Sequence, residues 1–285
     1  MRWRGERQSD RVEDRRGRSV ARGGAAIGGG ALLLALLYSL FTGQDPGQLL
    51  EVLGGGPQVS VDEGPVPTGA PADELGQFAA TILASTEDVW SEVFAREGQT
   101  YQPPTLVLFE NGVASACGTA SSAVGPFYCP PDRKLYLDLS FFKLLDQRFA
   151  APGDFAAAYV IAHEVGHHVQ NLLGIADQVQ QAEQRLGREE ANALSVRMEL
   201  QADCLAGVWG HHTNREKHWL EPGDVEEGLR AAAAIGDDMM QRHAGGDIQP
   251  ESWTHGSSEM RVRWLREGLS TGDADRCDTF RAERL

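Results

Sequence analysis

His163-Glu164-Val165-Gly166-His167 lies inside an apolar stretch with helical spacing, residues 154–174. Two histidines four residues apart lie one above the other on the same helix face, so both imidazoles can bind one Zn²⁺. Between them, Glu164 is placed beside the water that such a metal activates. The pattern predicts metal-assisted hydrolysis, most often of a peptide bond. So short a motif also occurs by chance. A third metal ligand and its supporting residues must therefore be found elsewhere in the chain.

A catalytic zinc site needs a third protein ligand. Glu199 and Asp203 are four residues apart on a second predicted helix, residues 188–211, and so face the same way. Glu199 would complete a His₂Glu site, and Asp203 could accept a hydrogen bond from the free ring nitrogen of a ligand histidine. The alternative is that both carboxylates line a solvated helix face. Their neighbours are largely apolar, where unpaired carboxylates are costly.

Four other histidines near these helices are expected to have ordinary roles. His168 points roughly 100° away from His167 and is predicted to be a bystander. His211, His212 and His218 lie near the end of the second helix, where capping or surface histidines are common.

Several further segments accompany the two helices and together resemble the putative neutral zinc metallopeptidase family of bacteria. The resemblance is carried by His163-Glu-Val-Gly-His-His-Val-Gln170, Glu199-Leu-Gln-Ala-Asp-Cys-Leu-Ala-Gly207, Trp253-Thr-His-Gly-Ser-Ser258, Gly125-Pro-Phe-Tyr-Cys129, Tyr136-Leu-Asp138 and the opening Met1-Arg-Trp-Arg-Gly5. It covers nearly the whole chain apart from residues 42–72. This family is similar to the gluzincin peptidases. The resemblance implies a zincin-like fold, Glu199 as third zinc ligand, Glu164 as general base and Asp203 as support for a ligand histidine.

A peptidase of this type also needs a hydrogen-bond donor for the oxyanion of the tetrahedral intermediate. His255 lies in Thr254-His-Gly-Ser-Ser258, a segment of turn-forming residues that could reach over the metal. The alternative is that His255 caps the helix that follows. Tyr136 and Tyr159 are further candidates for the donor.

Residues 73–285 are predicted to form the metallopeptidase domain, with an α+β, helix-dominated fold and a small sheet. Apolar spacing predicts helices at residues 73–96 and 224–240 besides the two above. Strands are predicted at residues 105–109 and 134–139. By analogy with gluzincins, the second strand is expected at a sheet edge, where it would hold an extended substrate.

The chain before this domain falls into three predicted segments. Residues 1–22 are basic, residues 23–41 carry no charge, and residues 42–72 are a Gly/Pro-rich linker. Nineteen helical residues span roughly 28 Å, close to the ~30 Å of a bilayer core. The sequence therefore predicts a single-pass membrane anchor at 23–41, and the arginines before it predict a cytoplasmic N-terminus and an extracytoplasmic domain. A cleaved signal peptide is the alternative, against which stand the long basic segment and the lack of a small-residue cleavage site after Phe41.

Net charge and cysteine content indicate which partners the chain can bind and whether its cysteines pair. The net charge is −15, with eight arginines against four acids in residues 1–22, which argues against nucleic-acid binding by the acidic remainder. The four cysteines allow three pairings, of which Cys117–Cys129 with Cys204–Cys277 is expected outside the cytoplasm. Four buried free thiols are the alternative.

The sequence thus predicts a membrane-anchored zinc metallopeptidase that acts on peptide or protein substrates. Three other functions stay open: a metal-stabilised binding or chaperone-like module of the cell envelope, a zinc hydrolase of a non-peptide amide, and a structural protein without metal. The sequence indicates neither the substrate nor the oligomeric state.

Overall fold

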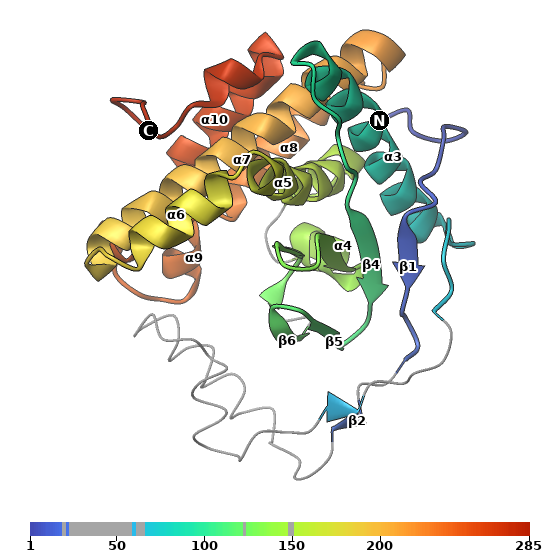
Figure 1. The fold of residues 1–285 in the computed structure, drawn as a ribbon, viewed down its shortest axis with the longest axis horizontal. Helices are drawn as coiled ribbons and strands as arrows, with labels where there is room; N and C mark the ends of the chain where they lie inside the picture. Colours follow the sequence, from blue (N-terminus) through green and yellow to red (C-terminus); the bar gives the residue numbers. More distant parts are fainter. Residues whose placement is uncertain (19–20, 23–58, 61–65, 122–123, 148–150) are drawn as a thin grey trace.

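The computed structural model describes residues 1–18, 21–22, 59–60, 66–121, 124–147 and 151–285. Helices dominate the body and a small sheet lies against them (Figure 1). The helices are α3 (Glu74–Arg96), α4 (Ser140–Gln147), α5 (Asp154–Leu172), α6 (Ile175–Glu183), α7 (Arg188–Lys217), α8 (Asp224–Ala234), α9 (Asp237–His243) and α10 (Ser258–Thr271), with 3₁₀ turns η2 (Pro250–Ser252) and η3 (Ala274–Cys277). The predicted α+β, helix-dominated class is confirmed.

The main sheet has four strands in the order β1-β4-β8-β7. Its strands are β1 (Val12–Asp14), β4 (Thr105–Phe109), β7 (Phe127–Cys129) and β8 (Lys134–Asp138). β1, β4 and β8 run parallel, and β7 is antiparallel to β8. Two small antiparallel pairs accompany it, formed by β2 (Ala21–Arg22) with β3 (Val59–Ser60) and by β5 (Gly112–Ser115) with β6 (Gly118–Ser121).

Helix α5 lies at the centre of the helical layer, and most of its length is buried against α3, α7 and α8. Its sequence explains this position, since alanine and valine fill the space between neighbouring helices without polar atoms. Gly166 allows α7 to come especially close, because a side chain there would meet the Ala202 carbonyl oxygen at 3.0 Å. The sequence motif is therefore held on a rigid, buried helix.

The predicted strand 105–109 is confirmed, but the role predicted for the strand at 134–139 is wrong. β8 lies between β4 and β7, and both of its edges are paired, so it offers no free edge to a substrate. The short strand β7 lies at that end of the sheet instead. The predicted helix 224–240 is two helices, α8 and α9. They separate at Gly236, where the backbone passes so close to Ser258 that a Cβ would meet its nitrogen at 2.4 Å.

The N-terminal residues differ from the prediction of a separate basic segment at 1–22. Residues 1–18 belong to the body: β1 adds to the sheet beside β4, and Trp3 and Val12 lie in the core. The sequence did not predict this packing, because the many arginines of the segment outweigh its few apolar residues. The boundary expected after residue 22 therefore does not separate residues 1–18 from the domain.

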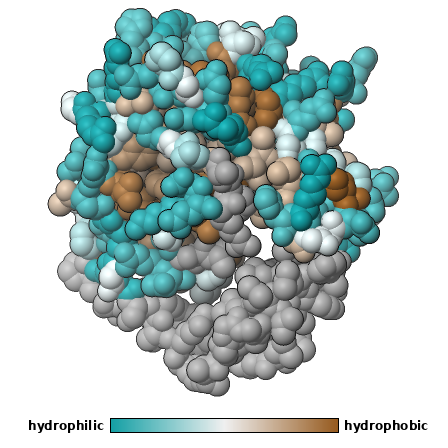
Figure 2. Space-filling view, turned by 180° about the vertical axis from the view of Figure 1, so that it is seen from behind, coloured by the Kyte–Doolittle hydropathy of each residue, from teal (hydrophilic) through white to brown (hydrophobic). Residues whose placement is uncertain are grey.

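No helix within the described ranges is both long and apolar enough to cross a membrane. The predicted span at residues 23–41 lies outside the described residues, as does most of the predicted linker at 42–72. On the face shown in Figure 2, hydrophilic side chains predominate and apolar ones form scattered patches. This distribution agrees with the strongly acidic composition.

Both predicted disulfides, Cys117–Cys129 and Cys204–Cys277, are present, and no cysteine is free. The first attaches the end of β7 to the turn between β5 and β6. The second attaches η3, near the C-terminus, to the middle of α7. The alternative of four buried thiols is wrong.

Candidate metal centre

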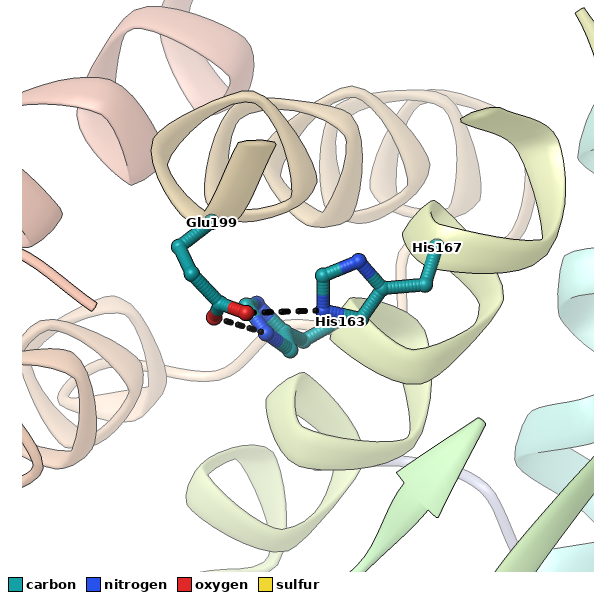
Figure 3. A group of neighbouring side chains, drawn as sticks. All are labelled: His163, His167 and Glu199. Carbon is teal, nitrogen blue, oxygen red and sulfur yellow. Dashed lines mark hydrogen bonds and ion pairs between the residues drawn. The ribbon is translucent and has the colours of Figure 1, made fainter. Parts of the chain in front are cut away.

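His163 and His167 from α5 and Glu199 from α7 point toward one another (Figure 3). The Nε2 atom of His163 lies 3.2 Å from Glu199 Oε2, and the Nε2 atom of His167 lies 3.4 Å from Glu199 Oε1. Ligand atoms about 2.0–2.1 Å from a tetrahedral zinc ion lie about 3.3–3.4 Å apart. Two imidazoles and one carboxylate at these separations fit a zinc ion with an open fourth position.

The close approach of the two helices explains how Glu199 reaches the histidines. Gly166 lies between the ligand histidines and packs on Ala202, three residues after Glu199 on α7. Any larger residue at position 166 would push the helices apart. The glycine inside the motif thus sets the distance between the two halves of the site.

His163 is held by a buried network on the side away from Glu199. Its Nδ1 atom lies 2.9 Å from Asp203 Oδ1, and Asp203 also accepts hydrogen bonds from the Tyr159 hydroxyl at 2.5 Å and from Arg261 at 2.9 Å. An Nδ1–H that donates to Asp203 leaves Nε2 free for a metal. Asp203 therefore occupies the position predicted for it. Sequence reasoning missed Arg261, which comes from α10 and has no local signal near the motif.

His167 has a comparable partner within its own helix. Its Nδ1 atom lies 2.9 Å from Gln170 Oε1, and the Gln170 amide donates in turn to the Met198 carbonyl and to Gln201. This arrangement fixes the tautomer that leaves Nε2 of His167 free. Gln170 was also missed as a site residue, although its position three residues after His167 places it on the same helix face.

The charges of the cluster follow from burial and from these partners. Burial disfavours a charged imidazole, but Asp203 and Glu199 outweigh it and raise the pKa of His163 to about 10, so a metal that binds at Nε2 would have to displace a proton from the ring. Burial alone would raise the pKa of Asp203, yet Arg261 and His163 lower it. The Glu199 carboxyl, although buried, has its pKa lowered by His167 and His255, so it is ionised. Burial raises the pKa of Glu164, which suits a carboxylate that accepts a proton and then releases it.

His255 lies on a loop that Asp237 holds in place. One Asp237 oxygen accepts the backbone N–H groups of Thr254, His255 and Gly256 at 2.7–2.9 Å, and the other lies 3.3 Å from His255 Nδ1. The side chain of His255 is half-exposed. Ser257, and not His255, caps α10, so the capping alternative is wrong.

The two tyrosines considered as oxyanion donors already have other partners. Tyr159 is fully buried behind His163 and donates its hydroxyl hydrogen to Asp203. Tyr136 donates to Asp132 at 2.7 Å and stacks on Phe127. Of the three candidates, His255 alone has a half-exposed side chain.

His168 was predicted to be a bystander, and it makes no contact with the metal cluster. It is buried and joins α5 to β7: its Nε2 donates to the Gln102 carbonyl at 2.7 Å, and its Nδ1 accepts from the Tyr128 hydroxyl at 2.9 Å. Burial lowers its pKa to about 4, so the ring is neutral. His168 therefore fixes the edge strand relative to the metal helix.

The remaining histidines of α7 have the ordinary roles that were expected. His211 and His212 hydrogen-bond to the carbonyls of Leu269 and Gly272, and His218 is the C-cap residue of α7. Within the described ranges, the other group of side chains close enough to hold a metal is Asp154, Asp224 and Glu227. The Met1 ammonium pairs with the first two at 3.1 and 3.2 Å, which accounts for that cluster without a metal.

Comparison with known proteins agrees with the geometry. The family model described as "Putative neutral zinc metallopeptidase" matches residues 1–280. The chain is 46% identical to the uncharacterized protein YpfJ of Escherichia coli K12, over 98% of this chain and 99% of that protein. It is 43% identical to the uncharacterized protein Rv2575 of Mycobacterium tuberculosis, over 76% of this chain and 75% of that protein. No solved structure matches.

Proposed function

The chain belongs to the neutral zinc metallopeptidase family, and from that premise we propose that it hydrolyses peptide bonds at a zinc ion held by His163, His167 and Glu199. The observation that carries this proposal is the convergence of these three side chains at ligand-to-ligand spacing. Asp203 and Gln170 each fix one histidine, as the partners of zinc-bound histidines commonly do.

Zinc in this site would supply a Lewis acid that polarises the scissile carbonyl and makes water more acidic. Glu164 then takes the proton of the attacking water and passes it to the departing amine. Burial raises the pKa of Glu164, which makes its carboxylate a stronger base than a solvated one. Asp203 and Arg261 keep His163 oriented throughout.

His255 is the proposed donor to the oxyanion. Asp237 holds its backbone and lies beside Nδ1, which leaves Nε2 for a substrate oxygen. His255→Ala is expected to lower kcat by about 10²–10³-fold with little change in zinc content, because removal of one oxyanion donor has that effect. Steady-state kinetics and elemental analysis measure both quantities.

The matched control for His255 is His218→Ala, at the far end of α7, which should leave kcat unchanged. An unaltered kcat in the His255 variant would remove the residue from the mechanism.

An extended peptide is proposed to bind along β7, the strand that ends the sheet on the side of α5. Main-chain hydrogen bonds to a strand edge hold peptides with little regard for side chains. The Tyr128–His168 hydrogen bond keeps this strand at a fixed distance from the metal helix. Peptides N-methylated next to the scissile bond should therefore show a raised KM.

The test of the function combines metal content with cleavage of a peptide library by the full chain. We expect stoichiometric zinc, loss of cleavage on treatment with a chelator and recovery when zinc is returned. Bound zinc without peptide cleavage would favour a binding or chaperone-like module. Cleavage of cell-wall amides alone would indicate a non-peptide amide hydrolase. Absence of zinc would favour a structural protein without metal.

The domain is proposed to act outside the cytoplasm, attached to the membrane through residues 23–41. The two disulfides support this location, since such bonds persist in oxidising compartments. Labelling of a cysteine introduced at an exposed position of the domain, with a membrane-impermeant reagent in intact cells, measures on which side of the membrane the domain lies.

A further inference from the structure

β1 is held between two segments that both follow residues 23–41 in the chain (Figure 1). On one side it pairs in parallel with β4, with Val12 opposite Leu106. On the other side, Asp14 N–H donates to the Pro67 carbonyl and Gly69 N–H donates to the Val12 carbonyl, both at 2.9 Å. The N-terminal strand is therefore enclosed by the domain that comes after it.

Residues before β1 are equally part of the core. The Trp3 side chain is 6% exposed and meets the Phe78 ring edge-on at 5.2 Å. The backbone N–H of Arg2 donates to the Trp219 carbonyl, and that of Ser9 donates to the Ala80 carbonyl. Burial of a tryptophan with its neighbouring backbone paired is typical of an integral segment and not of a detachable tail.

The arginines of this segment have acidic partners in the domain. These pairs are Arg2–Glu221, Arg4–Glu74, Arg7–Glu87, Arg7–Asp88 and Arg16–Asp73. Exposed ion pairs contribute little to stability. These pairs do show that the arginines, which the sequence analysis took as evidence for a cytoplasmic N-terminus, complement the acidic charge of the domain.

The two ends of the segment 23–58 lie side by side, because β2 (Ala21–Arg22) pairs with β3 (Val59–Ser60). A single membrane crossing by residues 23–41 would place residues 1–22 and the domain on opposite sides, and β1 could then not pair with β4. We infer that residues 1–18 and 66–285 lie on the same side of the membrane. The expected single crossing with a cytoplasmic N-terminus is replaced by this arrangement.

Cysteine labelling tests the inference in cells that produce the full chain. Asp10→Cys lies in the N-terminal segment and Thr100→Cys in the domain, and both positions are exposed. The four native cysteines are paired, so the parent protein is the unreactive control. With a membrane-impermeant maleimide, both variants should react to the same extent before lysis. Reaction of one before lysis and of the other only after lysis overturns the inference.

A second measurement tests the packing itself. Trp3→Ala should lower the thermal midpoint of the detergent-purified full chain by roughly 10 °C, because a large core side chain is lost. Arg4→Ala, the matched change one residue on, removes an exposed ion pair and should shift it by less than about 2 °C. Equal, small shifts for both variants would mean that residues 1–18 are not packed in the domain. Neither measurement requires catalytic activity.

Discussion

Glu164→Gln should stop peptide hydrolysis while the protein keeps its zinc. The amide preserves the size of the side chain but cannot take a proton from water, and loss of a positioned general base lowers rates by about 10²–10⁴-fold. None of the proposed ligands is altered, because Glu164 is not among His163, His167 and Glu199. Single-turnover kinetics with a cleaved library peptide, together with elemental analysis, measures rate and metal separately.

The control for this variant is Glu92→Gln, an exposed change on α3 with the same loss of charge. It should have parental activity. If Glu164→Gln cleaved peptides as fast as the parent, the assignment of the base would be wrong. If the variant lost zinc, the loss of turnover would report on the metal and not on the base.

Removal of the Cys204–Cys277 disulfide should lower the free energy of unfolding by about 4 kcal/mol, because the bond closes a loop with a sequence separation of 73. The double change Cys204→Ala and Cys277→Ala leaves two small apolar side chains at these buried positions. Glu199 and Asp203 lie on the same part of α7, so zinc affinity should fall together with stability. Chemical denaturation and zinc competition measure the two effects.

The Cys117–Cys129 pair provides the matched comparison. Its sequence separation is 12, so the same double substitution there should cost about 3 kcal/mol. The two losses should also appear when the parent is unfolded in a reducing agent. An unfolding free energy that is insensitive to both reduction and substitution of Cys204 and Cys277 would show that this bond does not form in the native protein.

At the candidate site, sequence reasoning predicted which residues share a helix face, because the determinants of that placement are local. The spacing of His163 and His167 is a property of one helix, and the spacing of Glu199 and Asp203 is a property of another. That the two helices bring these residues together was implied by family resemblance. Arg261 could not be predicted, because only the packing of α10 on α7 places its guanidinium beside Asp203.

The fold shows the same division between local and long-range determinants. Strand β4 and helix α3 were predicted because their apolar residues repeat along short stretches. β7 was missed since three residues carry no usable pattern. The break at Gly236 was missed because its cause, the close passage of Ser258, is distant in the chain. β1 was missed for a different reason: its strand lies within a run of arginines.

The enclosure of β1 also bears on the order in which the protein can assemble during synthesis. Residues 1–18 leave the ribosome before their partners at Leu106 and Pro67, which emerge only after a long intervening chain. Until then, Trp3 and Val12 have nothing to pack against, and closing so long a loop is entropically slow. β1 is thus synthesised before the segments that enclose it and can take its place only after they have emerged.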